Sequence, residues 1–231
     1  MRTKKAVINT MTSIMAEVVS IICGLILPRL ILGAFGSSYN GITSSITQFL
    51  SCIVLLRAGV GSVTRAALYN PLSKKDKSEI SGIVNATAIF MKKVALIYVG
   101  ALIVFACVYP FLVRNSFSWI FSATLVLIIG SSTFVDNYFG IAYQMLLQAD
   151  QKNYVNTIPQ IVTTILNTIV AAVLIHCGAG IHLVKLGSAI VYFIRPLFLS
   201  YYVKKKYEID ADIKPNNSAI SQRWDAFAQQ A

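Results

Sequence analysis

Long apolar stretches alternate with short polar connectors along the whole chain. A membrane-spanning helix needs about 20 consecutive, mostly apolar residues, and six segments meet that requirement. They lie at residues 10–35, 41–68, 94–113, 117–145, 155–177 and 181–203. The pattern predicts an all-α, polytopic membrane protein in which residues 1–203 form a six-helix transmembrane bundle.

The composition supports this class of protein. Of the 231 residues, 56% are hydrophobic and only 13% are charged, whereas about 25% of a typical soluble domain is charged. The low charge content excludes a disordered chain and a basic nucleic-acid-binding domain, and it argues against most water-soluble enzymes. We therefore expect no nucleic-acid partner.

The charges are distributed unevenly between two sets of connectors. Lys and Arg outnumber Asp and Glu by 20 to 9. Almost all connector cations lie at the N-terminus, in 69–93, in 146–154 and after residue 203, whereas 36–40, 114–116 and 178–180 carry Arg114 alone. By the positive-inside rule, both ends of the bundle's chain are cytoplasmic.

Residues 204–231 form a separate segment after the last apolar stretch. The run Lys204–Lys206 predicts a basic cytoplasmic tail in contact with membrane lipids, although its plainer role is to orient the last helix. The residues from Ser221 onward look like the start of a further structural segment that the chain does not complete, so we expect the chain to be a fragment of a longer protein. Upstream, Ile80, Ile83, Val84 and Met91 have helical spacing and predict an interfacial helix before the third span.

Signatures of enzymes and metal sites are missing from the sequence. It contains no P-loop, HExxH, GxSxG or dinucleotide fingerprint. The four cysteines lie far apart in apolar runs, and the two histidines lack partner ligands. We expect no catalytic residue, no metal and no cofactor.

Ionisable residues at membrane depth are the main candidates for function, because burying a charge in a bilayer is costly unless it faces water or a partner. Five of them are cationic and two are acidic: Arg29, Arg57, Arg65, Lys185, Arg195, Glu17 and Asp136. The excess of cations predicts a wet cavity that holds counter-ions or an anionic substrate.

Small and polar residues also follow one face of five of the six predicted helices. The stripes include Gln48 and Ser51 on the second, Asp136 and Gly140 on the fourth, Asn167 on the fifth, and Lys185, Ser188, Tyr192 and Arg195 on the sixth. Converging stripes predict either a hydrophilic cavity or interhelical hydrogen bonding.

Less specific interpretations stay open for several of these residues. Small residues are a common packing device between membrane helices, and Arg29, Arg65 and Lys185 are close enough to helix ends to snorkel. Arg57 falls almost opposite the polar stripe of its own helix. Glu17 and Asp136 are candidate proton or sodium sites, with an ion pair to Arg65 or Arg195 as the alternative.

Several short motifs, moderately specific as a set, resemble the N-terminal half of polysaccharide biosynthesis proteins of the O-antigen flippase type, in the multidrug/oligosaccharidyl-lipid/polysaccharide exporter superfamily. The resemblance covers essentially the whole chain. Its motifs are Lys4-Lys5-Ala6 with Asn9-Thr10, Leu27-Pro28-Arg29, Leu32-Gly33, Tyr39-Asn40-Gly41-Ile42, Leu55-Leu56, Gly59-Val60-Gly61, Leu68-Tyr69-Asn70-Pro71-Leu72 and Gln148-Ala149-Asp150-Gln151-Lys152.

The resemblance implies one lobe of a two-lobe transporter in the bacterial cytoplasmic (inner) membrane, with a missing C-terminal lobe as its partner. Such proteins move undecaprenyl-pyrophosphate-linked oligosaccharide repeat units to the outer leaflet. Glycosyltransferases, which assemble these units, and a polysaccharide polymerase, which joins them, are therefore expected partners. Arg29, Arg195, Lys185 and Arg57 would attract pyrophosphate. Glu17 and Asp136 would balance charge or couple an ion, and Gln48, Asn167 and Tyr192 would contact sugar. Related sequences often carry an acidic residue where this chain has Arg57, which weakens an ion-coupling role there.

Two other functions remain open from the sequence. A drug or cation antiporter of the same superfamily would need a net acidic interior, which the excess of cations opposes. A truncated fragment that does not transport is the third possibility, because one lobe supplies one wall of a cavity.

Overall fold

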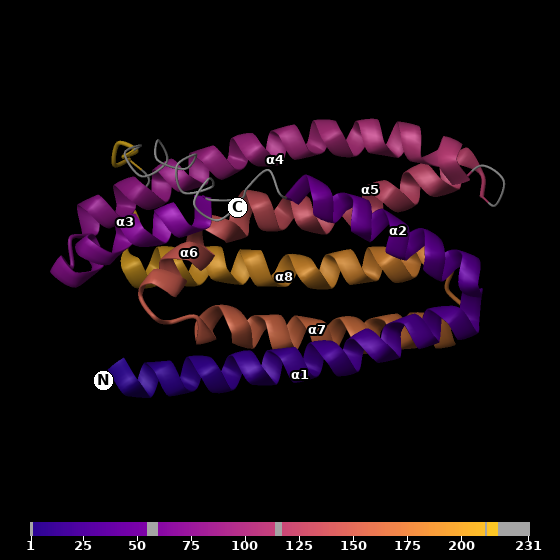
Figure 1. Ribbon diagram of the computed structural model, residues 1–231, viewed down its shortest axis with the longest axis horizontal. Coiled ribbons are helices and arrows are strands. Elements are labelled where there is room, and N and C mark those ends of the chain that lie inside the picture. Colours follow the sequence, from indigo (N-terminus) through magenta and orange to yellow (C-terminus); the bar gives the residue numbers. More distant parts are fainter. Residues whose placement is uncertain (1, 55–59, 114–116, 211, 217–231) are drawn as a thin grey trace.

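The computed structural model describes residues 2–54, 60–113, 117–210 and 212–216, and these fold into helices joined by tight turns, with no strand among them (Figure 1). In chain order the helices are α1 (Arg2–Phe35), α2 (Ser37–Val54), α3 (Val60–Lys74), α4 (Lys77–Val113), α5 (Trp119–Val135), the π-helical turn η2 (Asp136–Gly140), α6 (Ile141–Ala149), α7 (Tyr154–His176) and α8 (Ile181–Tyr207). The predicted all-α class is confirmed.

Five helical stretches are long and apolar enough to cross a membrane. They are Lys4–Phe35, Lys77–Val113, Trp119–Ala149, Tyr154–His176 and Ile181–Tyr207. The predicted span at 41–68 corresponds to α2 and α3, with residues 55–59 outside the described part of the chain. The structure therefore establishes a multi-pass membrane bundle and leaves the count of six spans unconfirmed.

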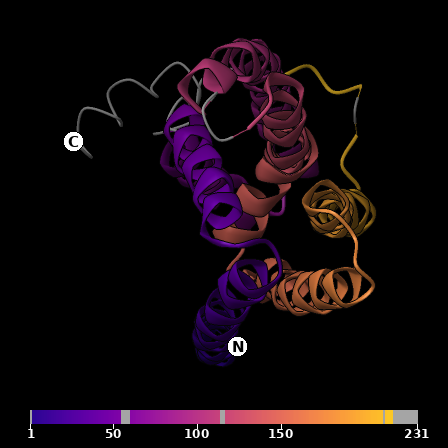
Figure 2. The same ribbon diagram turned by 90° about the vertical axis from the view of Figure 1, so that its right-hand side faces the viewer.

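The helices lie roughly side by side along the long axis of the molecule. Helix α7 packs between α1 and α8, and α5 packs against both α4 and α8 (Figures 1 and 2). Two of the turns between helices are tight because glycine accepts a left-handed backbone: Gly36, with φ of 89°, connects α1 to α2, and Gly178, with φ of 76°, lies between α7 and α8. Short connections of this kind hold successive helices antiparallel.

Helix α4 corrects one prediction about the segment before the third span. Residues 77–113 form one continuous helix of 37 residues, about 55 Å long, which is far more than the roughly 30 Å of a bilayer core. The apolar face that includes Ile80, Ile83 and Val84 is buried against Leu146 and Leu199. The interfacial-helix prediction was wrong because this face packs on protein and does not lie in the membrane surface.

A single π-helical turn interrupts the long helix formed by α5 and α6. It spans Asp136–Gly140 and packs against both α4 and α8. Such turns accommodate one extra residue within an α-helix and are frequent at functional sites. Gly140 closes this turn, and a methyl group there would stand 2.8 Å from Asp136 Oδ1 and 3.1 Å from Pro196 Cβ.

A charged cluster links α1 and α8 to the turn between α6 and α7, at the end of the bundle that carries Lys74, Lys152 and Lys204 and that we call the basic end. It consists of Lys5, Asp150, Lys152 and Tyr207, and we call it the Asp150 cluster. Lys152 Nζ lies 2.5 Å from Asp150 Oδ2, Tyr207 donates a hydrogen bond to the same oxygen at 2.5 Å, and Lys5 Nζ lies 3.6 Å from Oδ1. Burial alone would raise the pKa of the Asp150 carboxyl, but the hydrogen bonds from Lys152 and Tyr207 and the charges of Lys152 and Lys5 together hold it below its ordinary value.

Two further hydrogen bonds tie the start of α1 to the start of α7. Asn9 Oδ1 accepts the backbone N–H of Tyr154 at 2.9 Å, and Asn9 Nδ2 donates to the Gln151 carbonyl at 2.9 Å. With the Asp150 cluster, these bonds fix the relative positions of α1, α7 and α8 at the basic end.

We predict that the Asp150 cluster makes stability depend on pH in the acid range. Because the pKa of Asp150 is lower in the folded protein than its ordinary value of 3.8, its stabilisation is complete above that value and is lost as the pH falls through the lower, folded value. Thermal unfolding of detergent-purified protein should show a Tm that falls over this range in the wild type and falls less in Asp150→Asn. Equal acid sensitivity of the two proteins would contradict the assignment.

Gly130 on α5 lets α4 and α5 approach closely. A Cβ at this position would overlap both methyl carbons of Leu102 on α4, and the Gly130 carbonyl accepts a hydrogen bond from the Tyr98 hydroxyl at 3.2 Å. We predict that Gly130→Ala lowers the Tm, with overpacking costing about 1–3 kcal/mol. Gly100→Ala on α4 is the matched control, since no atom lies within 4 Å of its Cβ position, and its Tm should not fall.

Candidate functional site

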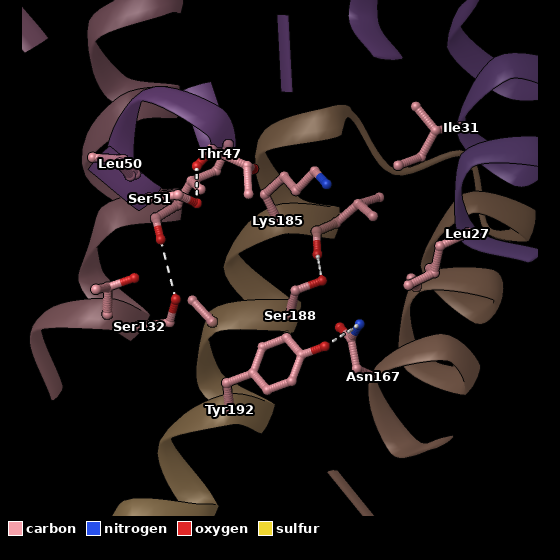
Figure 3. Close-up of a pocket in the computed structure, with 15 residues that line it drawn as sticks. Leu27, Ile31, Thr47, Leu50, Ser51, Ser132, Asn167, Lys185, Ser188 and Tyr192 are labelled. Carbon is pink, nitrogen blue, oxygen red and sulfur yellow. Dashed lines mark hydrogen bonds between the residues drawn. The ribbon is translucent and has the colours of Figure 1, made fainter. Parts of the chain in front are cut away.

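A cavity of about 310 Å³ lies among α1, α2, α5, α7 and α8, and we call it the central cavity (Figure 3). Its walls mix aliphatic, hydroxyl and amide side chains with one cation. The lining residues are Leu27, Ile31, Thr47, Leu50, Ser51, Ile129, Ser132, Thr133, Asn167, Ala171, Val184, Lys185, Ser188, Ala189 and Tyr192. No Asp or Glu is among these described lining residues.

Lys185 supplies the charge of the central cavity. It lies on the second turn of α8, and its ammonium group points into the space between α2 and the Leu27–Ile31 part of α1 (Figure 3). Within the described part of the chain it forms no ion pair or hydrogen bond. A half-buried ammonium without a partner favours an anion or water in the cavity.

Asn167 and Tyr192 form a polar pair across the cavity from α7 and α8. Asn167 Nδ2 donates to the Tyr192 hydroxyl at 3.2 Å, while Asn167 is only 3% exposed. Its Oδ1 is buried and has no hydrogen-bond partner among the described residues. Rotating the amide by 180° would leave a donor unpaired instead, so one polar atom of Asn167 is unsatisfied in either orientation.

The hydroxyl groups of the cavity can act mainly as acceptors. Ser51 donates to the Thr47 carbonyl at 2.9 Å, and Ser188 donates to the Val184 carbonyl at 3.1 Å. These bonds to the preceding helical turn use the hydroxyl protons and leave oxygen lone pairs available. Together with the unsatisfied Asn167 atom, they suit a ligand that carries hydroxyl groups.

A second cavity of about 360 Å³ adjoins the first, and we call it the Asp136 cavity. The two share Ser51, Ser132, Thr133 and Tyr192, and the Asp136 cavity adds Asp136, Arg195 and Pro196. The two cavities therefore form one polar path along α8. Lys185 and Arg195 mark this path about 15 Å apart, from ten residues at 1.5 Å each.

Hydrogen bonds position both charged groups of the Asp136 cavity. Asp136 Oδ1, in the π-helical turn, accepts from Gln144 Nε2 at 3.0 Å. Arg195 Nη2 donates to Asn156 Oδ1 on α7 at 2.9 Å. One carboxylate and one guanidinium thus face the same space.

The structure brings together five of the nine residues to which the resemblance assigns a role. Lys185, Asn167, Tyr192, Asp136 and Arg195 line the two cavities. Their convergence follows from the polar stripe on α8, whose members Lys185, Ser188, Tyr192 and Arg195 all reach one cavity or the other.

The other four residues lie elsewhere. Arg29, Glu17 and Gln48 are exposed on α1 and α2 and line neither cavity, and Arg57 lies outside the described residues. Neighbouring residues take the place of Gln48, since Thr47 and Ser51 of the same helix line the central cavity. Arg65 donates to Gln148 Oε1 at 2.8 Å near the basic end.

Two contributors to the site were not singled out in the sequence. Ser132 lies four residues before Asp136, and this helical spacing is the signal that could have found it. Gln144 is recognisable only through the π-helical turn, which brings it against Asp136. Helical spacing alone does not indicate such a turn.

Comparisons with protein-family models, with curated proteins and with solved structures found no match in any of the three.

We predict that the central cavity is wet. In a variant whose native cysteines are replaced, Ser188→Cys should react with a membrane-impermeant thiol reagent, because only a hydrated thiol ionises and reacts readily. Ile190→Cys, on the exposed apolar face of the same helix, is the matched control and should stay unlabelled in membranes. Equal labelling at the two positions, or none at Ser188→Cys, would contradict a wet cavity.

Proposed function

We propose that this chain is one lobe of a membrane transporter that moves a lipid-linked oligosaccharide, joined to its lipid by pyrophosphate, across the bacterial cytoplasmic membrane. The observation that supports this most directly is the Lys185 ammonium, which has no partner among the described residues and lies in a cavity walled by hydroxyl and amide groups. The motifs that resemble O-antigen flippases support the same assignment.

The pyrophosphate needs cationic partners at membrane depth. Lys185 and Arg195 provide them at two levels of the polar path, and the carboxylate of Asp136 offsets one of these charges. A net positive path lowers the cost of moving an anionic group through a low-dielectric region. Arg195 is suited to phosphate oxygens because its guanidinium presents several donors in a planar fork.

The sugar hydroxyls need acceptors and donors along the same path. Free acceptor capacity is present at Asn167 Oδ1 and at the Ser51 and Ser188 oxygens, whose protons are already donated to backbone carbonyls. The Tyr192 hydroxyl is hydrogen-bonded to Asn167. The central and Asp136 cavities, at about 310 and 360 Å³, fall in the range of ordinary ligand sites. A ligand with both anionic and hydroxyl groups therefore matches the walls better than a purely apolar compound does.

The exposed faces of α1 and α2 supply room for a second lobe. Leu25 is 71% exposed and Phe49 is 48% exposed, and Arg29, Glu17 and Gln48 lie on the same two helices. We propose that a second six-helix lobe, related to this one by an axis along the membrane normal, closes the cavity, and that the two lobes alternate access to it. The basic end would then face the cytoplasm.

A drug or cation antiporter is the second candidate, and Asp136 is the observation in its favour. A carboxylate in a membrane cavity, hydrogen-bonded by Gln144, is the type of group that binds protons or cations. Arg195 in the same cavity opposes that role.

The test compares Lys185→Gln and Arg195→Gln with Lys93→Gln, which removes an exposed cation outside both cavities. With each variant replacing the native copy, we expect surface polysaccharide to fall at least tenfold for the two cavity variants and to stay normal for Lys93→Gln. Losing a hydrogen bond to a charged group costs about 1.5–3 kcal/mol, which corresponds to roughly a tenfold to hundredfold loss of affinity.

Membrane abundance, measured by immunoblot, controls for misfolding. Normal polysaccharide in both cavity variants at normal abundance would overturn the proposal. Loss of drug or cation efflux in Asp136→Asn, with normal polysaccharide, would favour the antiporter instead.

A further inference from the structure

A third cavity, of about 350 Å³, lies between α4 and α8 at the basic end, and we call it the α4–α8 groove. It shares no residue with the central or Asp136 cavity. Helices α4 and α8 are bridged there by η2 and α6, each of which packs against both. The groove is lined by Asn85, Ala88, Ile89, Met91, Lys92, Asn137, Tyr138, Phe139, Ala142, Tyr143, Ser200, Lys204, Ile209 and Pro215.

The charge of this groove has one sign. Lys92 comes from α4 and Lys204 from α8, and the described lining residues include no carboxylate. Lys92 Nζ lies 5.3 Å from the ring centroid of Tyr138 in the π-helical turn, a cation–π contact that holds the ammonium over the groove wall. The groove thus presents two lysines, one from each wall.

The position of the lysines along the helices corresponds to the head-group level of a membrane. The uncharged part of α4 begins at Val94, two residues after Lys92, and Lys204 begins the basic triplet in the last turn of α8. Ile89, Phe139 and Tyr143 line the same groove and give it an apolar wall. A cationic rim beside an apolar wall suits an amphiphile with a negative head group.

The segment after α8 covers the end of the groove. The Asp210 backbone N–H donates to Ser81 Oγ at 3.3 Å, Asn85 Nδ2 donates to the carbonyls of Asp210 and Ile213 at 2.8 and 3.1 Å, and the Asn216 N–H donates to the Gly82 carbonyl at 3.0 Å. Figure 2 shows this segment running from α8 across to α4. Ile209 and Pro215, from the same segment, line the groove.

We propose that the α4–α8 groove is a binding site for an anionic phospholipid, with Lys92 and Lys204 as cationic partners of its head group and Ile89, Phe139 and Tyr143 as its apolar contacts. The occupant is a membrane lipid because the cationic rim and the apolar wall adjoin, whereas a free phosphate ion would use only the rim. This inference is independent of the transport function, since the groove is separate from the other two cavities.

The test uses the full chain purified in detergent and titrated with phosphatidylglycerol, phosphatidylcholine or inorganic phosphate. We expect phosphatidylglycerol to remain bound in native mass spectrometry and to raise the Tm, and phosphatidylcholine and inorganic phosphate to do neither. In Lys92→Gln/Lys204→Gln, phosphatidylglycerol binding should weaken at least tenfold.

The matched control is Lys93→Gln/Lys206→Gln, which removes two neighbouring exposed charges that do not line the groove. This control should retain phosphatidylglycerol as the wild type does. Equal loss in the two double variants would overturn the proposal in favour of a diffuse basic surface. Stabilisation by inorganic phosphate equal to that by phosphatidylglycerol would overturn the lipid as occupant, and so would absence of a phosphatidylglycerol preference in the wild type.

Discussion

The cost of a polar group away from water controls how this bundle is built. Within a bilayer, backbone groups are satisfied by the helices themselves, so each remaining charge needs a side-chain partner, water or a ligand. Arg65 has Gln148, Arg195 has Asn156 and Asp136 has Gln144. Lys185 and one polar atom of Asn167 are not satisfied by the described residues, and both lie in the central cavity. Water or a ligand in that cavity can satisfy these two groups.

The basic residues serve two separate purposes. Lys5 and Lys152 form ion pairs with Asp150 in the Asp150 cluster, which links α1 and α8 to the turn between α6 and α7. Lys92 and Lys204 stay available at the rim of a groove. Some of the cations behind the net charge of +11 therefore form ion pairs that stabilise the bundle, and others stay accessible at its surface. The contacts of each lysine show to which group it belongs.

Hydropathy predicted the helices well because length and apolar content decide whether a segment spans a membrane. The stripe on α8 was also predictable, since Lys185, Ser188, Tyr192 and Arg195 repeat at helical spacing within one uninterrupted helix. The direction in which Arg29 and Gln48 point could not be predicted, because it depends on how α1 and α2 pack. The hydrogen bond between the Tyr154 N–H and Asn9 Oδ1 joins residues 145 positions apart. No local sequence pattern predicts such a long-range contact. The buried face at Ile80–Val84 has the same apolar spacing as a helix that lies at the membrane surface. Only the packing of α3, α6 and α8 against this part of α4 shows that the face is buried in protein.

The π-helical turn at Asp136–Gly140 has a consequence for comparing this chain with relatives. An extra residue in a helix rotates everything beyond it by about 100°, so the faces of α5 and α6 are out of phase with each other. Before the turn, Ser132 and Thr133 face the cavities, while after it Leu146 and Leu147 enter the core. An alignment to a homologue that lacks this turn requires a one-residue gap there. Without the gap, substitutions inferred for α6 would be assigned to a face rotated by about 100° around the helix.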